Sequence, residues 1–158
     1  MRLRQTMFNS MNDHQYLDMV EVRETYKKCL RIVIAEAGVQ EHSGEITPAE
    51  EPNQILRELL NNSKPIEVTS ESIRYEIEFE DYIAYAITNE SYAGNIEEKY
   101  EGRLARTYSE SAFLNYIKQG TIATVEYPGP FVHYGFCCLN QILDIVSESP
   151  PRIKVITV

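Results

Sequence analysis

The sequence lacks several features by which a function is commonly recognised. It has no tryptophan, and its seven glycines are scattered. They never fall into the G-x-G-x-x-G or G-x-x-x-x-G-K-S/T spacing that cradles nucleotide phosphates. Neither C-x-x-C nor H-x-x-x-H spacing occurs, so no set of zinc ligands is predicted. From these absences we expect no metal and no cofactor.

Cysteine and long apolar runs are also scarce. The three cysteines, Cys29 and the adjacent Cys137 and Cys138, do not suggest a disulfide framework. Reduced thiols are typical of the cytoplasm. The first residues lack the apolar segment of a secretory signal, and nowhere do 18 apolar residues run together. We therefore expect a cytoplasmic protein that does not enter a membrane.

Positive charge is scarce relative to negative charge. The chain carries 15 Lys and Arg against 24 Asp and Glu, for a net charge of −9. Phosphates repel such a protein unless it has a segregated basic patch, so we expect no binding to nucleic acid. The negative charge is concentrated between Glu71 and Glu101, where nine acidic residues stand against Arg74 and Lys99.

Within that acidic stretch, residues 73–80 alternate between apolar and charged types. This alternation is typical of a half-buried strand, which would present a row of carboxylates to water. Five of the eleven tyrosines lie in the same stretch, and tyrosine is enriched at protein interfaces, although these rings could equally fill the core. The leading hypothesis is a non-enzymatic domain that binds a basic protein through Glu76, Glu78, Glu80, Asp81, Tyr82 and Tyr92. In general character such a protein resembles immunity proteins and other inhibitors, without a motif that assigns it to them.

A second hypothesis places a small-molecule site or an enzyme active site near the C-terminus. Strands over 131–139 and 142–147, turning at Asn140-Gln141, would put Cys137 opposite Asp144 and His133 opposite Glu148 on one face. Four residues of strand separate the backbones of His133 and Cys137 by about 13 Å, which disfavours a Cys-His dyad. The alternative is that these cysteines and this histidine are packing residues.

A third hypothesis is a homo-oligomer joined through an edge strand. Residues 153–158 alternate Ile153, Val155 and Thr157 with Lys154, Ile156 and Val158. Few charges in this segment would block pairing with a second copy.

The order of the patterns predicts a single α+β domain over residues 1–158. Apolar residues spaced by threes and fours predict a long helix over 13–37. A short helix follows at 55–60, and another is capped by Ser109 or Ser111 and ended by Gly120. We expect these helices on one face of a mostly antiparallel sheet, with residues 1–12 loose and 39–52 a loop. The predicted strands cover 66–68, 73–79, 82–87, 100–107, 122–127, 131–139, 142–147 and 153–158.

Overall fold

A computed structural model describes residues 2–26, 28–40, 54–55 and 64–156, in which the strands form two five-stranded antiparallel sheets. The first sheet has the order β1-β2-β4-β10, with β3 paired to β2. Its strands are β1 (Tyr16–Glu24), β2 (Leu30–Val39), β3 (Ile66–Glu67), β4 (Arg74–Phe79) and β10 (Arg152–Ile156). The second sheet has the order β5-β9-β8-β7-β6. Its strands are β5 (Tyr82–Asn89), β6 (Lys99–Glu101), β7 (Ala105–Glu110), β8 (Val132–Cys137) and β9 (Gln141–Ser147).

The predicted fold is wrong in its helices, because the described residues between Asp13 and Ala37 form no long helix. They form the hairpin of β1 and β2, which pair from Tyr16 with Ala37 to Glu24 with Leu30. The chain reverses through a turn in which the N–H of Lys28 donates to the carbonyl of Thr25 over 3.0 Å, with Lys28 at a φ of 56°. Lysine is not a typical residue for that left-handed conformation, so the sequence carried no turn signal. The predicted set of three helices on one face of one sheet is therefore replaced by two sheets.

Two short α-helices have defined bounds in the described part of the chain. Helix α1 (Arg2–Ser10) occupies residues expected to be loose, and the 3₁₀-helix η1 (Met11–Asp13) follows it. Helix α3 (Ala112–Gly120) is confirmed: the Ser111 hydroxyl caps it by accepting the N–H of Leu114 over 3.0 Å. Most of the predicted helix at 55–60 and most of the predicted loop at 39–52 lie outside the described residues.

Two predicted strands are also corrected. The strand expected over 100–107 is two strands, β6 and β7, separated at Gly102, whose φ is +92°. A Cβ there would lie 2.0 Å from the carbonyl oxygen of Ala105, so only glycine fits. The strand expected over 122–127 is a turn that ends in a cis peptide bond between Tyr127 and Pro128.

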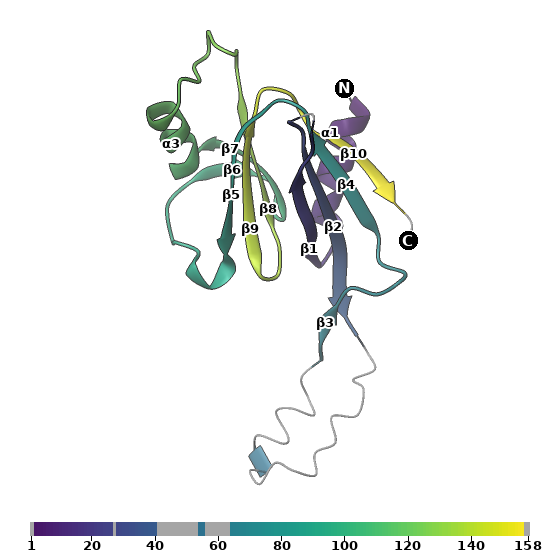
Figure 1. Ribbon diagram of the computed structural model, residues 1–158. Helices are drawn as coiled ribbons and strands as arrows, with labels where there is room; N and C mark the ends of the chain where they lie inside the picture. Colours follow the sequence, from purple (N-terminus) through teal and green to yellow (C-terminus); the bar gives the residue numbers. More distant parts are fainter. Residues whose placement is uncertain (1, 27, 41–53, 56–63, 157–158) are drawn as a thin grey trace.

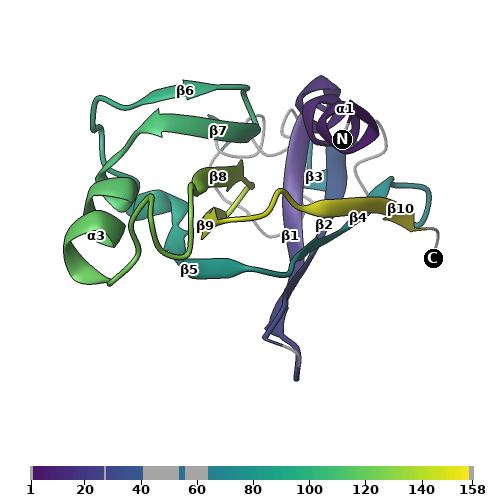
Figure 2. The same cartoon turned by 90° about the horizontal axis from the view of Figure 1, so that it is seen from above.

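The core lies between the two sheets. The inward residues of β2, β4, β8 and β9 pack with Phe8 and Met11 from the N-terminal segment into one cluster. Figure 2 shows α3 on the face of the second sheet that points away from the first sheet. The second sheet is therefore covered on one face by the core, whereas α3 packs on its other face. No helix among the described residues has the length and apolar character needed to cross a membrane.

Asn12 ties the N-terminal segment to the second sheet. Its Oδ1 accepts the backbone N–H groups of Arg103, Leu104 and Ala105 at 2.8, 2.7 and 2.9 Å, and its Nδ2 donates to the Ala105 carbonyl at 3.1 Å. One amide side chain thus satisfies four backbone groups at the start of β7.

Candidate functional site

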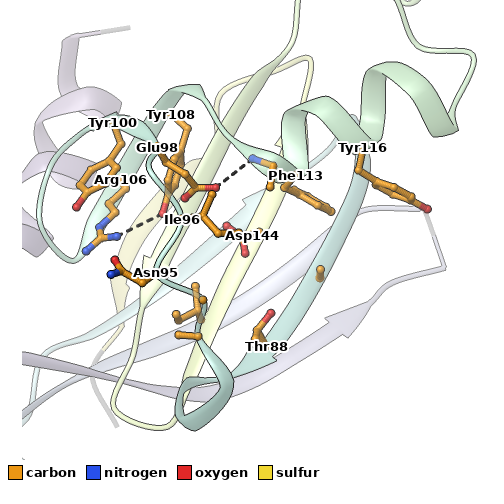
Figure 3. Close-up of a pocket in the computed structure, with 15 residues that line it drawn as sticks. Thr88, Asn95, Ile96, Glu98, Tyr100, Arg106, Tyr108, Phe113, Tyr116 and Asp144 are labelled. Atoms are coloured by element: carbon orange, nitrogen blue, oxygen red, sulfur yellow. Dashed lines mark hydrogen bonds between the residues drawn. The ribbon is translucent and has the colours of Figure 1, made fainter.

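The outer face of the second sheet holds a cavity of about 560 Å³ (Figure 3). Strands β5, β7 and β9 supply its floor, and α3 supplies one wall through Phe113 and Tyr116. The segment between the 3₁₀-helix η3 (Glu90–Tyr92) and β6 supplies the opposite wall. This volume lies within the range typical of small-molecule sites.

One row of residues runs across the second sheet at the cavity. The register aligns four residues on one face across four strands, namely Ala86 of β5, Asp144 of β9, Gly135 of β8 and Arg106 of β7. In the neighbouring row, α3 packs Leu114 and Ile117 against Val146. The helix therefore covers the row beside the Asp144 row and leaves the Asp144 row itself open.

Tyr108 depends on the absence of a side chain at Gly135. A Cβ on Gly135 would lie 2.7 Å from Cε2 of Tyr108. The tyrosine ring occupies this space and stacks on the imidazole of His133, with ring centroids 4.1 Å apart and planes 12° apart. Phe113 meets the same imidazole edge-on, at 5.4 Å. His133, which is only 1% exposed, is thus enclosed by two aromatic rings.

A chain of hydrogen bonds runs from α3 through His133 to the cavity. Ser111 Oγ lies 2.8 Å from Nδ1 of His133, and Nε2 lies 2.7 Å from Oδ1 of Asp144. A neutral imidazole satisfies both contacts when Nε2 carries the proton, because Ser111 then donates to Nδ1 and Nε2 donates to the carboxylate. Asp144 is the end of this chain that lines the cavity, so His133 fixes the position of the carboxylate there.

Ser111, His133 and Asp144 are the residue types of a hydrolase triad, but they are arranged differently. Ser111 is 5% exposed, and its hydroxyl oxygen is engaged as the cap of α3. A nucleophilic serine must instead be open to its substrate. The geometry therefore supports a positioned carboxylate at Asp144 and gives no support to a nucleophile at Ser111.

Arg106 provides the positive charge of the cavity. Its guanidinium lies over the ring of Tyr100 at 4.2 Å from the centroid, and its Nε donates to the Arg103 carbonyl at 2.8 Å. Its Nη1 lies 3.5 Å from the hydroxyl of Tyr108. Burial raises the pKa of Tyr108 to about 12, so this phenol stays neutral. Arg106 has no ion-pair partner among the residues that the structure describes.

Glu98 fastens the outer wall of the cavity to α3. Its Oε1 accepts the backbone N–H of Ala112 at 3.1 Å (Figure 3). This bond satisfies a donor at the first turn of the helix, where a carboxylate is also favoured by the helix dipole. The wall segment at residues 93–98 has no regular secondary structure of its own.

The four residues predicted as an enzyme or ligand site are only partly brought together. His133 pairs with Val146 and Cys137 with Ile142, so the predicted pairing of β8 and β9 is displaced by two residues. The Cys138 N–H donates to the Gln141 carbonyl over 2.9 Å, so the two-residue turn is Leu139-Asn140, one residue earlier than predicted. His133 and Asp144 become diagonal neighbours and bond to each other.

Of the other two predicted site residues, Glu148 lies apart from that pair, whereas Cys137 shares a strand face with Asp144. Glu148 lines a different cavity of about 570 Å³, beside Phe8 and Tyr134. Burial raises the pKa of Cys137, an effect that Arg106 opposes, and raises that of Cys138 to about 12. Both nitrogens of His133 are bonded to Ser111 and Asp144. His133 therefore has no free nitrogen for a thiol, and the pKa of both thiols stays raised.

The predicted row of carboxylates on β4 is matched by cations of neighbouring strands. Glu76 is 8% exposed and accepts from Arg31 Nε at 2.9 Å and Lys154 Nζ at 2.5 Å. Arg152 pairs with Glu80 and lies 3.6 Å from Glu78. The three carboxylates therefore share a face with their own counter-ions.

Of the remaining residues predicted to bind a partner, Asp81 and Tyr82 lie at the start of β5, and Tyr92 lies beyond its other end. Asp81 accepts from the hydroxyl of Ser149 at 2.7 Å. Tyr82 donates to Glu24 at 2.9 Å, and burial raises the pKa of this tyrosine to about 12. Tyr92 is exposed on η3.

The sequence does not identify four residues of the site. It predicts Ser111 only as a helix cap and assigns no role to Arg106, Tyr108 and Gly135. Arg106 and Tyr108 are two positions apart in a predicted strand, which indicates that their side chains lie on the same face. Their connection to His133 follows from strand order, which the sequence does not state.

In the described part of the chain, no three His, Cys, Asp or Glu residues converge in a way that could hold a metal ion. Comparison of the chain with protein-family models, with curated proteins and with solved structures finds no match.

Proposed function

We propose that this protein binds a small organic molecule in the cavity beside α3. The observation that supports this most directly is the Asp144 carboxylate, which is bonded to His133 through Oδ1 only and lines the cavity. Its Oδ2 has no hydrogen-bond partner among the described residues, so it is available to accept from a ligand.

The surroundings of Asp144 favour binding of an organic ligand over a purely structural role. Tyr100, Tyr108, Phe113 and Tyr116 contribute aromatic surface to the same cavity. Aromatic walls with a few fixed polar groups are characteristic of small-molecule sites. The two residues behind Asp144, Ser111 and His133, hold its carboxylate in place before a ligand arrives, which reduces the entropy lost on binding.

Binding of a basic protein by Glu76, Glu78, Glu80, Asp81, Tyr82 and Tyr92 is a second proposal. Tyr92 supports it, being 82% exposed on the acidic stretch. A basic partner would have to compete with Arg31, Arg152 and Lys154 for the three glutamates. The cavity is therefore the stronger candidate. For either function we propose a cytoplasmic location, in keeping with three unpaired cysteines.

A fragment screen followed by NMR tests the ligand proposal. We expect hits that perturb the backbone signals of Ala112, Phe113 and Asp144 in the wild type and bind more weakly to Asp144→Asn. Glu148→Gln, which removes the same charge at the other cavity, is the matched control and should bind normally. Hits that bind Asp144→Asn and the wild type equally would contradict the proposal.

A further inference from the structure

Two opposite charges stand on the floor of the cavity without neutralising each other. Arg106 and Asp144 are both aligned with Gly135, one on each neighbouring strand. Their backbones are thus two strand spacings apart, about 10 Å. Across the described residues, neither has an ion-pair partner of fixed charge, since Asp144 meets only the imidazole of His133.

Each of the two charged groups keeps hydrogen-bonding capacity for a ligand. Oδ2 of Asp144 and Nη2 of Arg106 have no bond to any described residue, whereas the other polar atoms of these groups do. A carboxylate oxygen only accepts, and a guanidinium only donates. A ligand that satisfies both must offer a donor at one end and an acceptor at the other.

The space between the charges is filled by an aromatic ring and its hydroxyl, which would lie 3.3 Å from a Cβ on Gly135. Gly135 contributes no side chain there, and the ring of Tyr108 lies over it. Figure 3 shows Tyr108 between Arg106 and Asp144, with Phe113 on the α3 side. A planar apolar body that spans the two charges would lie against this ring, since aromatic rings favour stacked and edge-on contacts.

We infer that the ligand is a zwitterion, with an ammonium group bound by Asp144, a carboxylate bound by Arg106 and a flat apolar body between them. This inference rests on the proposed function, because it assigns the chemical class of the ligand to the same cavity. The Arg106 guanidinium suits a carboxylate because its planar fork presents several donors.

Three probes built on one benzene ring separate the contributions of the two charges. 4-(Aminomethyl)benzoate carries both groups, benzylamine carries only the ammonium, and 4-methylbenzoate carries only the carboxylate. We expect NMR titration of the wild-type protein to give about tenfold tighter binding for 4-(aminomethyl)benzoate than for either single-charge probe, since each charge-assisted hydrogen bond contributes about that factor.

Variants assign each charge to its residue. In Arg106→Gln, 4-(aminomethyl)benzoate should bind no more tightly than benzylamine. In Asp144→Asn, it should bind no more tightly than 4-methylbenzoate. Lys118→Gln, on the exposed face of α3, is the matched control for loss of a positive charge and should change neither.

The wild-type titrations decide the inference even if a variant fails to fold. If benzylamine or 4-methylbenzoate binds the cavity as tightly as 4-(aminomethyl)benzoate, the inference of a zwitterionic ligand is overturned. The proposed function would still hold. If none of the three probes and no screened fragment perturbs the cavity signals, both the inference and the proposed function are overturned.

Discussion

A side chain at Gly135 and the present position of Tyr108 exclude each other, because a Cβ on Gly135 would lie 2.7 Å from Cε2 of the tyrosine ring. That ring stacks on His133, which in turn fixes the cavity carboxylate of Asp144. One backbone position without a side chain therefore sets the arrangement of the whole site.

Replacing Gly135 by alanine should displace the Tyr108 ring. We expect Gly135→Ala to lower the free energy of unfolding by about 1–3 kcal/mol, the usual cost of overpacking. Urea denaturation measures this loss, and near-UV circular dichroism reports the altered tyrosine environment. Gly38→Ala is the matched control, since a Cβ there meets nothing within 4 Å. Equal stability of the two variants would show that Tyr108 moves without cost.

Removing the Asn12 side chain should destabilise the junction between the N-terminal segment and β7. Asn12→Ala leaves the N–H groups of Arg103, Leu104 and Ala105 without their acceptor. We expect a loss of about 3 kcal/mol in the free energy of unfolding, because partly buried donors are left unpaired.

Asn12→Asp separates the two functions of the Asn12 amide. It keeps an acceptor for the three N–H groups but loses the donor to the Ala105 carbonyl, so its stability should fall between those of the wild type and Asn12→Ala. Asn115→Ala, on the exposed side of α3, is the control. If Asn12→Ala lowers the free energy of unfolding no more than this control does, Asn12 does not stabilise the junction.

Much of the C-terminal region could be predicted from sequence, because an error of two residues in strand register leaves each side chain on its predicted face. The expected pairing of β8 and β9 was displaced by two residues, yet Phe136 and Leu143 still face the core and Asp144 still faces away. Side chains alternate with a period of two, so an even displacement keeps every residue on its predicted face.

The N-terminal region could not be predicted from the spacing of apolar residues. Leu30, Ile32 and Ile34 are buried on one face of β2, but the same segment also fits a buried helix. The turn at Lys28 carries none of the usual residues, so nothing in the sequence separates β1 from β2. The link from Ser111 to His133 joins residues 22 positions apart and depends on tertiary packing alone.

The buried thiol of Cys138 should be almost inert in the native protein. Burial raises its pKa to about 12 from an ordinary value of 9.0, which lowers the thiolate fraction near pH 8 about a thousandfold. Alkylation by iodoacetamide should therefore be slower by at least that factor than in the unfolded chain, as followed by mass spectrometry. The variant Cys137→Ala isolates Cys138 from its neighbour. Rapid native alkylation would contradict the burial that we describe.

Glu76 should contribute stability that depends on pH. Its hydrogen bonds from Lys154 and Arg31 hold the pKa of this carboxyl below its usual value of 4.5. Because the pKa is lowered in the folded state, the contribution is complete above pH 4.5 and is lost as the pH falls through the lowered value. Glu76→Gln should lower the free energy of unfolding by about 2 kcal/mol at pH 7, and by progressively less below pH 4.5.

Urea titrations of the wild type and Glu76→Gln between pH 7 and pH 2.5 measure this convergence. Glu71→Gln removes the same formal charge from an exposed position without an ion pair among the described residues, and it is the matched control. Its stability should differ little from that of the wild type at each pH. A Glu76→Gln deficit that stays constant over this range would mean that the variant loses packing, and that the ion pairs with Lys154 and Arg31 add no net stability.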